Sequence, residues 1–214
     1  MNKLSLHFFF VTMAGICLLA NTANSTVWKE KNHGDAGQTL ATAQAILDGT
    51  DQINGWVTEP YADLFSFSWN GGAFKVSATG RNSSDLDTQL FLFDGNGFGI
   101  RSNDDENNNS DASFISVATL TSGNYYLGIS TFNTDPVDAN KNLIFPDTCI
   151  GQFSPNPGVG SLSNWVGDGD KNLSQGPYTI TFNKPTAPVP EPATMLLFGT
   201  GLAGLAGLRK RNKK

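Results

Sequence analysis

The stretch FSFSWNGGAFKVSA at residues 65–78 decides the fold class. Aromatic residues alternate with serines over its first five positions, and apolar residues alternate with polar ones from Phe74 to Ala78. A period of two is typical of a half-buried β-strand, and the triplet Asn70-Gly71-Gly72 between the two runs is typical of a tight turn. The stretch therefore predicts a β-hairpin.

Outward from this stretch, the same period continues toward the C-terminus. Leu90-Phe91-Leu92-Phe93 is apolar at every position, which predicts a central strand buried on both faces. Turn residues at 94–97 and 122–124 separate further alternating runs. The apolar positions of those runs are Ile115 and Val117, then Tyr125, Leu127 and Ile129, then Tyr178, Ile180 and Phe182. Seven or eight such strands, without a long helix between the two ends, predict an all-β fold, an antiparallel β-sandwich of two sheets.

Residues 133–175 break this pattern. They are rich in proline, glycine, asparagine and aspartate, and they lack a clear alternation of apolar and polar positions. We expect a long insertion before the last strand, and loops of this length are functional or mobile.

Composition and charge exclude some classes of protein. The 214 residues are 39% hydrophobic and 15% charged, which permits a folded core and excludes wholesale disorder. Between Thr26 and Pro188 there are 8 basic and 18 acidic residues, a net charge of −10. A body this acidic repels nucleic acid and anionic membrane surfaces, so nucleic-acid binding is excluded.

Residues 1–25 have the layout of a secretory signal peptide. Lys3 supplies the positive start, residues 8–20 are mostly apolar, and Ala23-Asn24-Ser25 offers small residues for cleavage after Ser25. The apolar run has thirteen residues, fewer than the ~20 that span a bilayer, which favours a cleaved signal over a retained anchor. Cleavage also removes Cys17 and leaves Cys149 as the only cysteine, which excludes an intrachain disulfide.

The C-terminal end has three parts in order. Residues 184–192 form a proline-rich spacer, residues 193–208 carry no charge, and residues 209–214 are almost all basic. A sixteen-residue helix is ~24 Å long against a hydrocarbon core of ~30 Å, and snorkelling by the basic side chains covers part of the difference. The order predicts a transmembrane helix at 193–208, a basic cytoplasmic tail at 209–214 and a body outside the membrane.

These three parts closely resemble the PEP-CTERM sorting signal of exopolysaccharide-producing Gram-negative bacteria. The resemblance rests on Val189-Pro190-Glu191-Pro192, the glycine-rich apolar segment after it and the basic end. It implies recognition by an exosortase, a membrane-embedded cysteine transpeptidase, with cleavage near the motif. The expected course is export through the inner membrane, transient anchoring by the C-terminal helix, and a final place at the cell surface or outside the cell. The alternative is a plain single-pass tail anchor with a coincidental Pro-Glu-Pro sequence.

The body of the chain resembles a second family, the bacterial pre-peptidase C-terminal (PPC-like) domains. The resemblance covers most of residues 34–183 and departs from the family at the insertion, about residues 133–175. It implies a jelly-roll-like sandwich that serves as a noncatalytic accessory or adhesion module. The segments that carry it are Gly34-Asp35-Ala36-Gly37, Ala41-Thr42-Ala43-Gln44, Asp63-Leu64-Phe65-Ser66-Phe67, Leu86-Asp87-Thr88-Gln89-Leu90-Phe91-Leu92-Phe93-Asp94, Ser102-Asn103-Asp104-Asp105, Ser122-Gly123-Asn124-Tyr125-Tyr126-Leu127-Gly128-Ile129 and Gly176-Pro177-Tyr178-Thr179-Ile180.

The body offers few residues for catalysis. His33 is the only histidine left after signal removal, the sequence has no Gly-x-Ser-x-Gly motif, and one histidine with one cysteine is too few for a zinc site. A glycine-rich phosphate loop with its lysine is also absent from the sequence. We therefore expect no enzymatic activity and no cofactor, with calcium as the exception to test.

Calcium takes oxygen ligands, which the acidic loops supply. Asn103-Asp104-Asp105-Glu106 is a dense acidic cluster, and Asp85 and Asp87 precede the central strand. Residues 168–173 match the first, third and fifth positions of an EF-hand loop but have leucine where glycine is required. The candidate ligands are Asp104, Asp105, Asp168 and Asp170. The alternative is that these residues form solvated turns, which aspartate and asparagine favour for backbone reasons.

These observations together predict an exported, exosortase-sorted cell-surface or extracellular-matrix protein. Its β-sandwich is expected to be a noncatalytic binding or structural module associated with exopolysaccharide. Two alternatives stay open, a calcium-dependent adhesion module and a secreted hydrolase that uses loop carboxylates.

Overall fold

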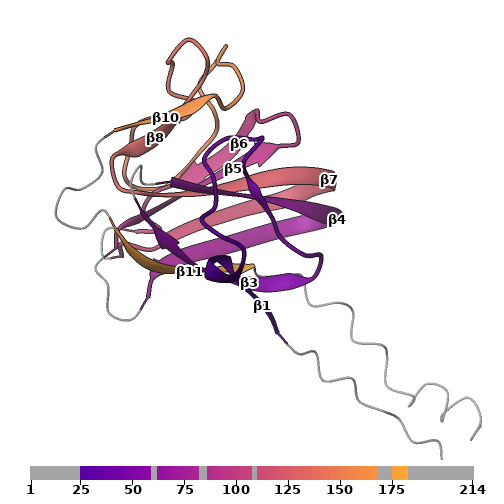
Figure 1. Cartoon of the computed structure of the whole chain (residues 1–214). Coiled ribbons are helices and arrows are strands. Elements are labelled where there is room, and N and C mark those ends of the chain that lie inside the picture. Colours follow the sequence, from indigo (N-terminus) through magenta and orange to yellow (C-terminus); the bar gives the residue numbers. More distant parts are fainter. Residues whose placement is uncertain (1–24, 59–61, 82–85, 108–109, 168–174, 183–214) are drawn as a thin grey trace, which may run out of the picture.

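The computed structural model describes residues 25–58, 62–81, 86–107, 110–167 and 175–182 (Figure 1). Within these ranges the chain forms eleven strands and one short 3-10 helix, η1 (Glu30–Asn32). The strands are β1 (Thr26–Lys29), β2 (Gln44–Ala45), β3 (Thr50–Val57), β4 (Ala62–Gly80), β5 (Thr88–Asp94), β6 (Gly99–Asn103), β7 (Ser113–Thr131), β8 (Thr134–Val137), β9 (Gln152–Phe153), β10 (Asn164–Gly167) and β11 (Gly176–Phe182). The all-β prediction is confirmed.

Nine of these strands form one sheet. Its order is β1-β3-β11-β4-β7-β5-β6-β9, with β2 paired to β4 outside this path, and β10 and β8 form a separate two-stranded sheet. Neighbouring strands are antiparallel, as predicted, except in two pairs, β1 with β3 and β2 with β4, which are parallel. The segment before residue 34 is therefore part of the sheet, because β1 extends it beyond β3.

The predicted hairpin at residues 65–78 is wrong. These residues lie within the single strand β4, which pairs with β7 from Ala62 opposite Ser130 to Ala78 opposite Ser113. The predicted turn at 122–124 is wrong for the same reason, because it lies inside β7. A short run of turn-forming residues does not specify whether the chain forms a hairpin or only bends within one long paired strand.

The glycines bend β4 instead. Gly71 and Gly72 have φ angles of 91° and 100°, and the β4–β7 register shifts between Gly72 and Phe74, as at a β-bulge. On a straight strand, Phe67 and Phe74 would lie ~23 Å apart. Their ring centroids are 5.6 Å apart, so the strand turns a sharp corner between them.

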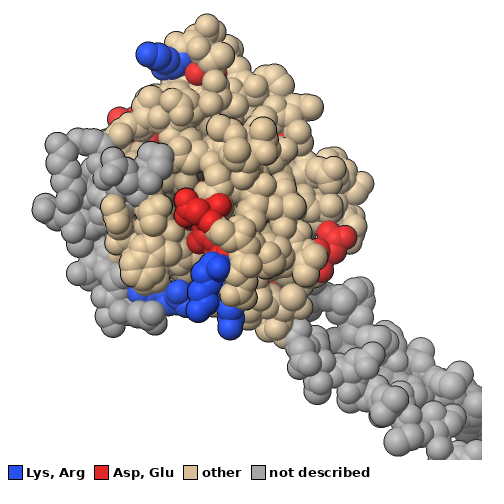
Figure 2. Space-filling view, in the orientation of Figure 1, with Lys and Arg blue, Asp and Glu red and all other residues tan. Residues whose placement is uncertain are grey.

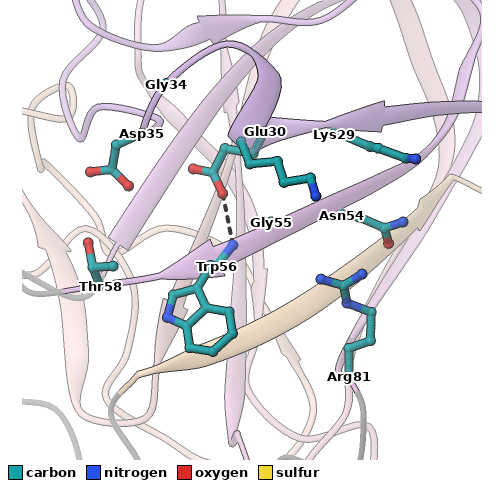
Figure 3. Close-up of a pocket in the computed structure, with 10 residues that line it drawn as sticks. Lys29, Glu30, Gly34, Asp35, Asn54, Gly55, Trp56, Thr58 and Arg81 are labelled. Atoms are coloured by element: carbon teal, nitrogen blue, oxygen red, sulfur yellow. Dashed lines mark hydrogen bonds between the residues drawn. The ribbon is translucent and has the colours of Figure 1, made fainter.

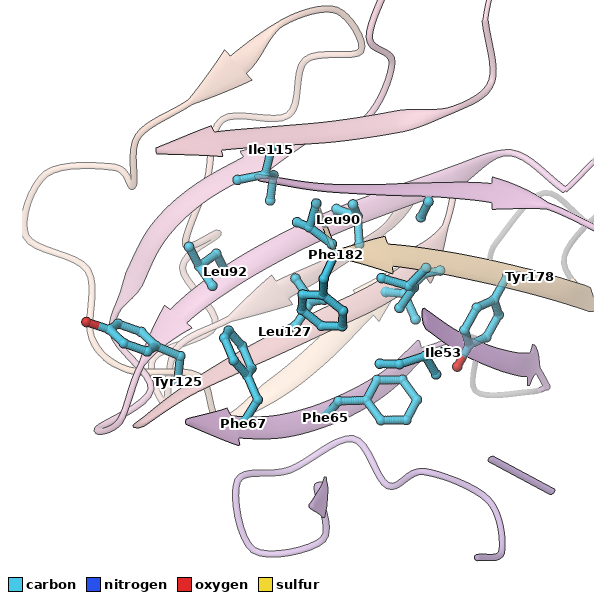
Figure 4. Close-up of a cluster of buried hydrophobic side chains, with 14 of the residues drawn as sticks. Ile53, Phe65, Phe67, Leu90, Leu92, Ile115, Tyr125, Leu127, Tyr178 and Phe182 are labelled. Atoms are coloured by element: carbon cyan, nitrogen blue, oxygen red, sulfur yellow. The ribbon is translucent and has the colours of Figure 1, made fainter. Parts of the chain in front are cut away.

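The corner folds the sheet into two layers around one core. On one side of it β4 pairs with β11, and on the other side β7 pairs with β5. Side chains from both layers share a single buried cluster (Figure 4), including Ile53 and Ile180 from one layer and Phe65, Leu92 and Leu127 from the other. The sandwich is thus one continuous sheet folded over on itself, and β4 and β7 belong to both layers.

The strand β5 is buried on both faces, as predicted. Leu90 and Leu92 face the core between the layers, whereas Phe91 and Phe93 belong to a second buried cluster. Its other buried members are Ala62 and Leu64 from β4 and Ile144, Phe145, Leu162 and Trp165 from the insertion.

Of the predicted insertion at residues 133–175, residues 133–167 are described, and they are not a structureless loop. They contain β8, β9 and β10 and cover the outer face of β5. The Phe91 and Trp165 rings lie 5.4 Å apart, and Trp165 Nε1 donates a hydrogen bond to the Gln38 carbonyl at 2.9 Å. The apolar residues of this segment are too widely spaced to form a periodic pattern in the sequence, which is why periodicity did not reveal its packing.

The predicted terminal segments lie outside the described residues, apart from Ser25. They are the signal peptide at 1–25, the spacer with its motif at 184–192, the apolar segment at 193–208 and the basic tail at 209–214. Among the helices of the described part, none has the length and apolar character needed to cross a membrane. Cys149 is exposed and unpaired.

Candidate functional site

A groove of about 490 Å³ opens beside β1, η1 and β3 (Figure 3). Asn54 and Trp56 line it from β3. Its charged lining residues are three basic ones, Lys29, Lys31 and Arg81, and two acidic ones, Glu30 and Asp35. Three of the eight basic residues between Thr26 and Pro188 therefore meet at one place on an acidic body. The face in Figure 2 is mostly uncharged and has a group of basic side chains near its lower edge, with a group of acidic side chains directly above it.

The alternation of β3 explains the lining of the groove. Ile53, Gly55 and Val57 point inward and are buried, which places Asn54 and Trp56 on the outer side. The Trp56 side chain is 51% exposed, although an indole of this size normally lies mostly buried. Its ring is therefore available to a ligand in the groove.

Glu30 also lines the groove and is hydrogen-bonded to the backbone of Trp56. Its Oε1 accepts a hydrogen bond from the Ala36 backbone N–H and its Oε2 accepts one from the Trp56 backbone N–H, both at 2.8 Å. These bonds fix the backbone of β3 against η1 at the centre of the groove. Burial raises the pKa of Glu30 above its ordinary value, although the two backbone donors oppose this shift.

Glu30 belongs to the first carboxylate cluster, which we define as Glu30, Asp35 and Asp63. One carboxylate oxygen from each residue lies within 4.8 Å of the other two. Asp63 is 2% exposed, and its Oδ2 accepts a hydrogen bond from the Tyr178 hydroxyl at 2.7 Å. Burial and the charge of Glu30 raise the pKa of Asp63 well above its ordinary value.

The second carboxylate cluster consists of Asp87, Asp104 and Asp105, whose oxygens also lie within 4.8 Å of one another. Asp87 precedes β5, and the other two follow β6. Since β5 and β6 are antiparallel, with Leu90 opposite Asn103, the start of one strand lies beside the end of the other. Sheet pairing therefore brings together residues that are seventeen positions apart in the sequence.

Two members of the second cluster, Asp104 and Asp105, have a carboxylate oxygen without a hydrogen-bond donor among the described residues. Asp104 is 5% exposed, and its Oδ1 atom and that of Asp105 are buried without a hydrogen-bond partner among the described residues. Burial, followed by the charges of Asp87 and Asp105, raises the pKa of Asp104 to about 8. Asp135 and Asp147 add further negative charge around it.

Asn103 holds this loop in place. Its Nδ2 donates to the Asp105 carbonyl at 2.8 Å and to the Gly151 carbonyl at 2.7 Å, and its Oδ1 accepts a bond from the Phe114 backbone N–H. The backbone N–H of Asp105 donates to the Cys149 carbonyl at 2.8 Å. The loop is therefore tied to both the insertion and β7.

The predicted candidate residues have different outcomes. The structure brings Asp104 and Asp105 together and adds Asp87, which the sequence analysis noted only as preceding the central strand. Asp168 and Asp170 lie outside the described residues, as does the predicted sorting signal Val189, Pro190, Glu191 and Pro192. The ring of His33 stacks on that of Trp28 at 3.8 Å.

Sequence reasoning missed the groove and the first cluster. Lys29, Trp56 and Arg81 belong to three different segments, and no spacing in the sequence relates them. The position of Asp63 in the sequence could have drawn attention to it, because a charged residue directly precedes the alternating apolar run that begins at Leu64. The sequence did not indicate its partners Glu30 and Tyr178, because only the fold brings them together.

Two family comparisons match this chain. Residues 188–211 match the PEP-CTERM protein-sorting motif, and residues 61–131 match the bacterial pre-peptidase C-terminal domain. Both resemblances noted in the sequence are thereby confirmed. The first motif is an exosortase recognition signal, which implies export to the cell envelope of a Gram-negative bacterium.

A solved structure of low sequence identity resembles this chain. Among solved structures, the chain is similar to the pre-peptidase C-terminal domain of a collagenase from Bacillus anthracis, at 8% sequence identity and a TM-score of 0.36. The similarity covers 75% of this chain and 97% of that chain. No curated protein matches the sequence.

Proposed function

We propose that this chain is an exported, exosortase-processed surface protein whose β-sandwich binds an acidic extracellular polysaccharide without catalysing its turnover. The observation that carries the proposal is the sorting-motif match at residues 188–211. The noncatalytic character of the pre-peptidase C-terminal domain, matched at residues 61–131, agrees with a binding role. Processing would release the body from its membrane segment, so the domain would act at the cell surface or outside the cell.

The groove supports the choice of ligand. An exposed aromatic ring with polar side chains around it presents an apolar face and hydrogen-bonding groups together, the combination that a sugar ring requires. The charges of Lys29, Lys31 and Arg81 complement carboxylated or sulfated sugars. These three basic residues outnumber the two acidic ones of the same lining, Glu30 and Asp35. The acidic remainder of the body would repel the same polymer, which confines its binding to the groove.

Sorting is tested by the mass of the mature C-terminus in an exosortase-bearing host. The wild-type chain should end near the motif, and Glu191→Ala should leave an uncleaved precursor in the inner membrane. Thr186→Ala, which changes the spacer outside the motif, should be processed like the wild type. A wild-type protein that still ends at Lys214 would refute the sorting function and support the tail anchor.

Polysaccharide binding is tested by affinity electrophoresis of the mature protein in gels containing hyaluronan or dextran, with EDTA present. Trp56→Ala should weaken retardation by hyaluronan at least tenfold. The matched control is Phe98→Ala, because Phe98 is 50% exposed and lies outside the groove. Retardation by hyaluronan should also weaken as salt is raised. Equal loss in both variants, or equal retardation by both polymers, would contradict the proposed ligand class.

A further inference from the structure

We propose that Asp87, Asp104 and Asp105 bind a calcium ion that joins the start of β5 to the end of β6. Three carboxylates converge at this point, and their oxygens lie within 4.8 Å of one another. Convergence alone is not sufficient, because the first carboxylate cluster has the same property.

The unpartnered oxygens distinguish the second cluster. Asp104 is 5% exposed, and its buried Oδ1 has no hydrogen-bond donor among the described residues. The buried Oδ1 of Asp105 also has no hydrogen-bond donor among these residues. A buried carboxylate oxygen without a donor is costly, and a cation at the point where the three side chains meet would supply the missing interaction.

The surroundings are arranged to hold such an ion. Asn103 clamps the loop through the Asp105 and Gly151 carbonyls, and the Asp105 backbone N–H is bonded to the Cys149 carbonyl. The two carboxylates after β6 are thus carried on a fixed backbone. Asp135 and Asp147 lie close enough to raise the pKa of Asp104, so they add to the negative potential that attracts a cation.

The chemistry of the cluster favours calcium. All of its ligands are carboxylate oxygens, which suit hard cations, and zinc sites normally use histidine or cysteine. Calcium accepts six to eight oxygens in irregular geometry, whereas magnesium demands a near-ideal octahedron. Three carboxylates from an irregular loop and a strand end match the first requirement better, and water or backbone carbonyls would complete the shell.

The test is the melting temperature of the full mature protein in EDTA and in millimolar calcium, together with titration calorimetry. Calcium at a hundredfold excess over its dissociation constant should raise the free energy of unfolding by about 2.7 kcal/mol. Calorimetry should show one strong site, and the same concentration of magnesium should give a smaller thermal shift. Identical melting curves in EDTA and in calcium would overturn the proposal.

Substitutions locate the site. Asp104→Asn keeps the shape of the side chain and removes one negative charge, so it should fold normally in EDTA and lose the calcium response. Asp105→Asn is the second variant, because Asp105 is only partly buried and its replacement perturbs the fold less. Asp35→Asn in the first cluster should keep the full response. The opposite result, with Asp35→Asn unresponsive and Asp104→Asn responsive, would move the ion to the first cluster and refute this assignment.

Discussion

Each of the two carboxylate clusters has three acidic residues, but the hydrogen bonding of the two clusters differs. In the first, both Glu30 oxygens accept backbone N–H groups and Asp63 accepts the Tyr178 hydroxyl. In the second, Asp104 and Asp105 each retain a buried oxygen with no donor among the described residues. The proximity of acidic groups therefore does not by itself define a binding site. The hydrogen-bond donors around the carboxylates decide whether these groups are satisfied within the fold or are available to a ligand.

The largest change in the free energy of unfolding is expected from disrupting the packing of the first cluster. A Cβ at Gly55 would lie 2.2 Å from the Tyr178 ring and hydroxyl and 2.7 Å from Glu30 Oε2. Gly55→Ala should therefore lower the free energy of unfolding by about 3 kcal/mol, measured by urea denaturation. Gly123→Ala is the control, because its Cβ would lie 3.7 Å from Tyr125, in ordinary contact. Similar stabilities for the two variants would show that this packing is not tight.

The next largest loss of stability should come from removing a single hydrogen-bond donor, the Tyr178 hydroxyl. Tyr178→Phe keeps the ring but leaves the buried Asp63 Oδ2 without its hydroxyl partner, so we expect a loss of about 2 kcal/mol. Tyr125→Phe removes a hydroxyl that bonds to Thr121, which is exposed to water, and it should cost less. Equal losses in urea denaturation would mean that burial of the acceptor does not matter here.

The smallest effect should be a dependence on pH that arises in the second cluster. The pKa of Asp104 is about 8 in the folded protein and near 3.8 when unfolded, so the native state holds the extra proton between these values. In EDTA the free energy of unfolding should therefore fall as the pH rises from about 4 to about 8. Asp104→Asn should flatten that part of the profile. Only one proton is involved, so the change is at most about 1.4 kcal/mol per pH unit, which is smaller than the effect of either substitution above.

Calcium should reverse this dependence. The ligands must lose their protons before they bind the ion, so affinity, and with it stability, should rise with pH. A wild-type profile with the same slope in calcium and in EDTA would contradict the contrast between the clusters.

Much of the fold could be predicted from the sequence, and the failures have a physical pattern. The fully apolar run at residues 90–93 correctly indicated a strand buried on two faces. The Asn70-Gly71-Gly72 triplet correctly indicated a change of direction but not its type, because positive φ angles serve a bulged corner as well as a hairpin. Which of the two forms depends on the partner strand β7, some fifty residues further along the chain.

The candidate site was predictable only where its residues are neighbours in sequence. Asp104 and Asp105 were found because they are adjacent and acidic. Asp87 joins them through the β5–β6 pairing, and the basic groove joins residues from β1, β3 and the end of β4. These associations depend on strand order, which periodicity does not encode.

The position of β11 has a mechanical consequence. It is the last described strand, and it lies between β3 and β4, with Tyr178 opposite both Gly55 and Gly80. If the protein is tethered through the segment after Phe182, an external pull enters the domain along this strand. The hydrogen bonds of antiparallel strands run across the direction of such a pull, so two ladders would have to shear at once. Because the unfolding rate governs survival under force, this arrangement favours a long lifetime under flow or traction.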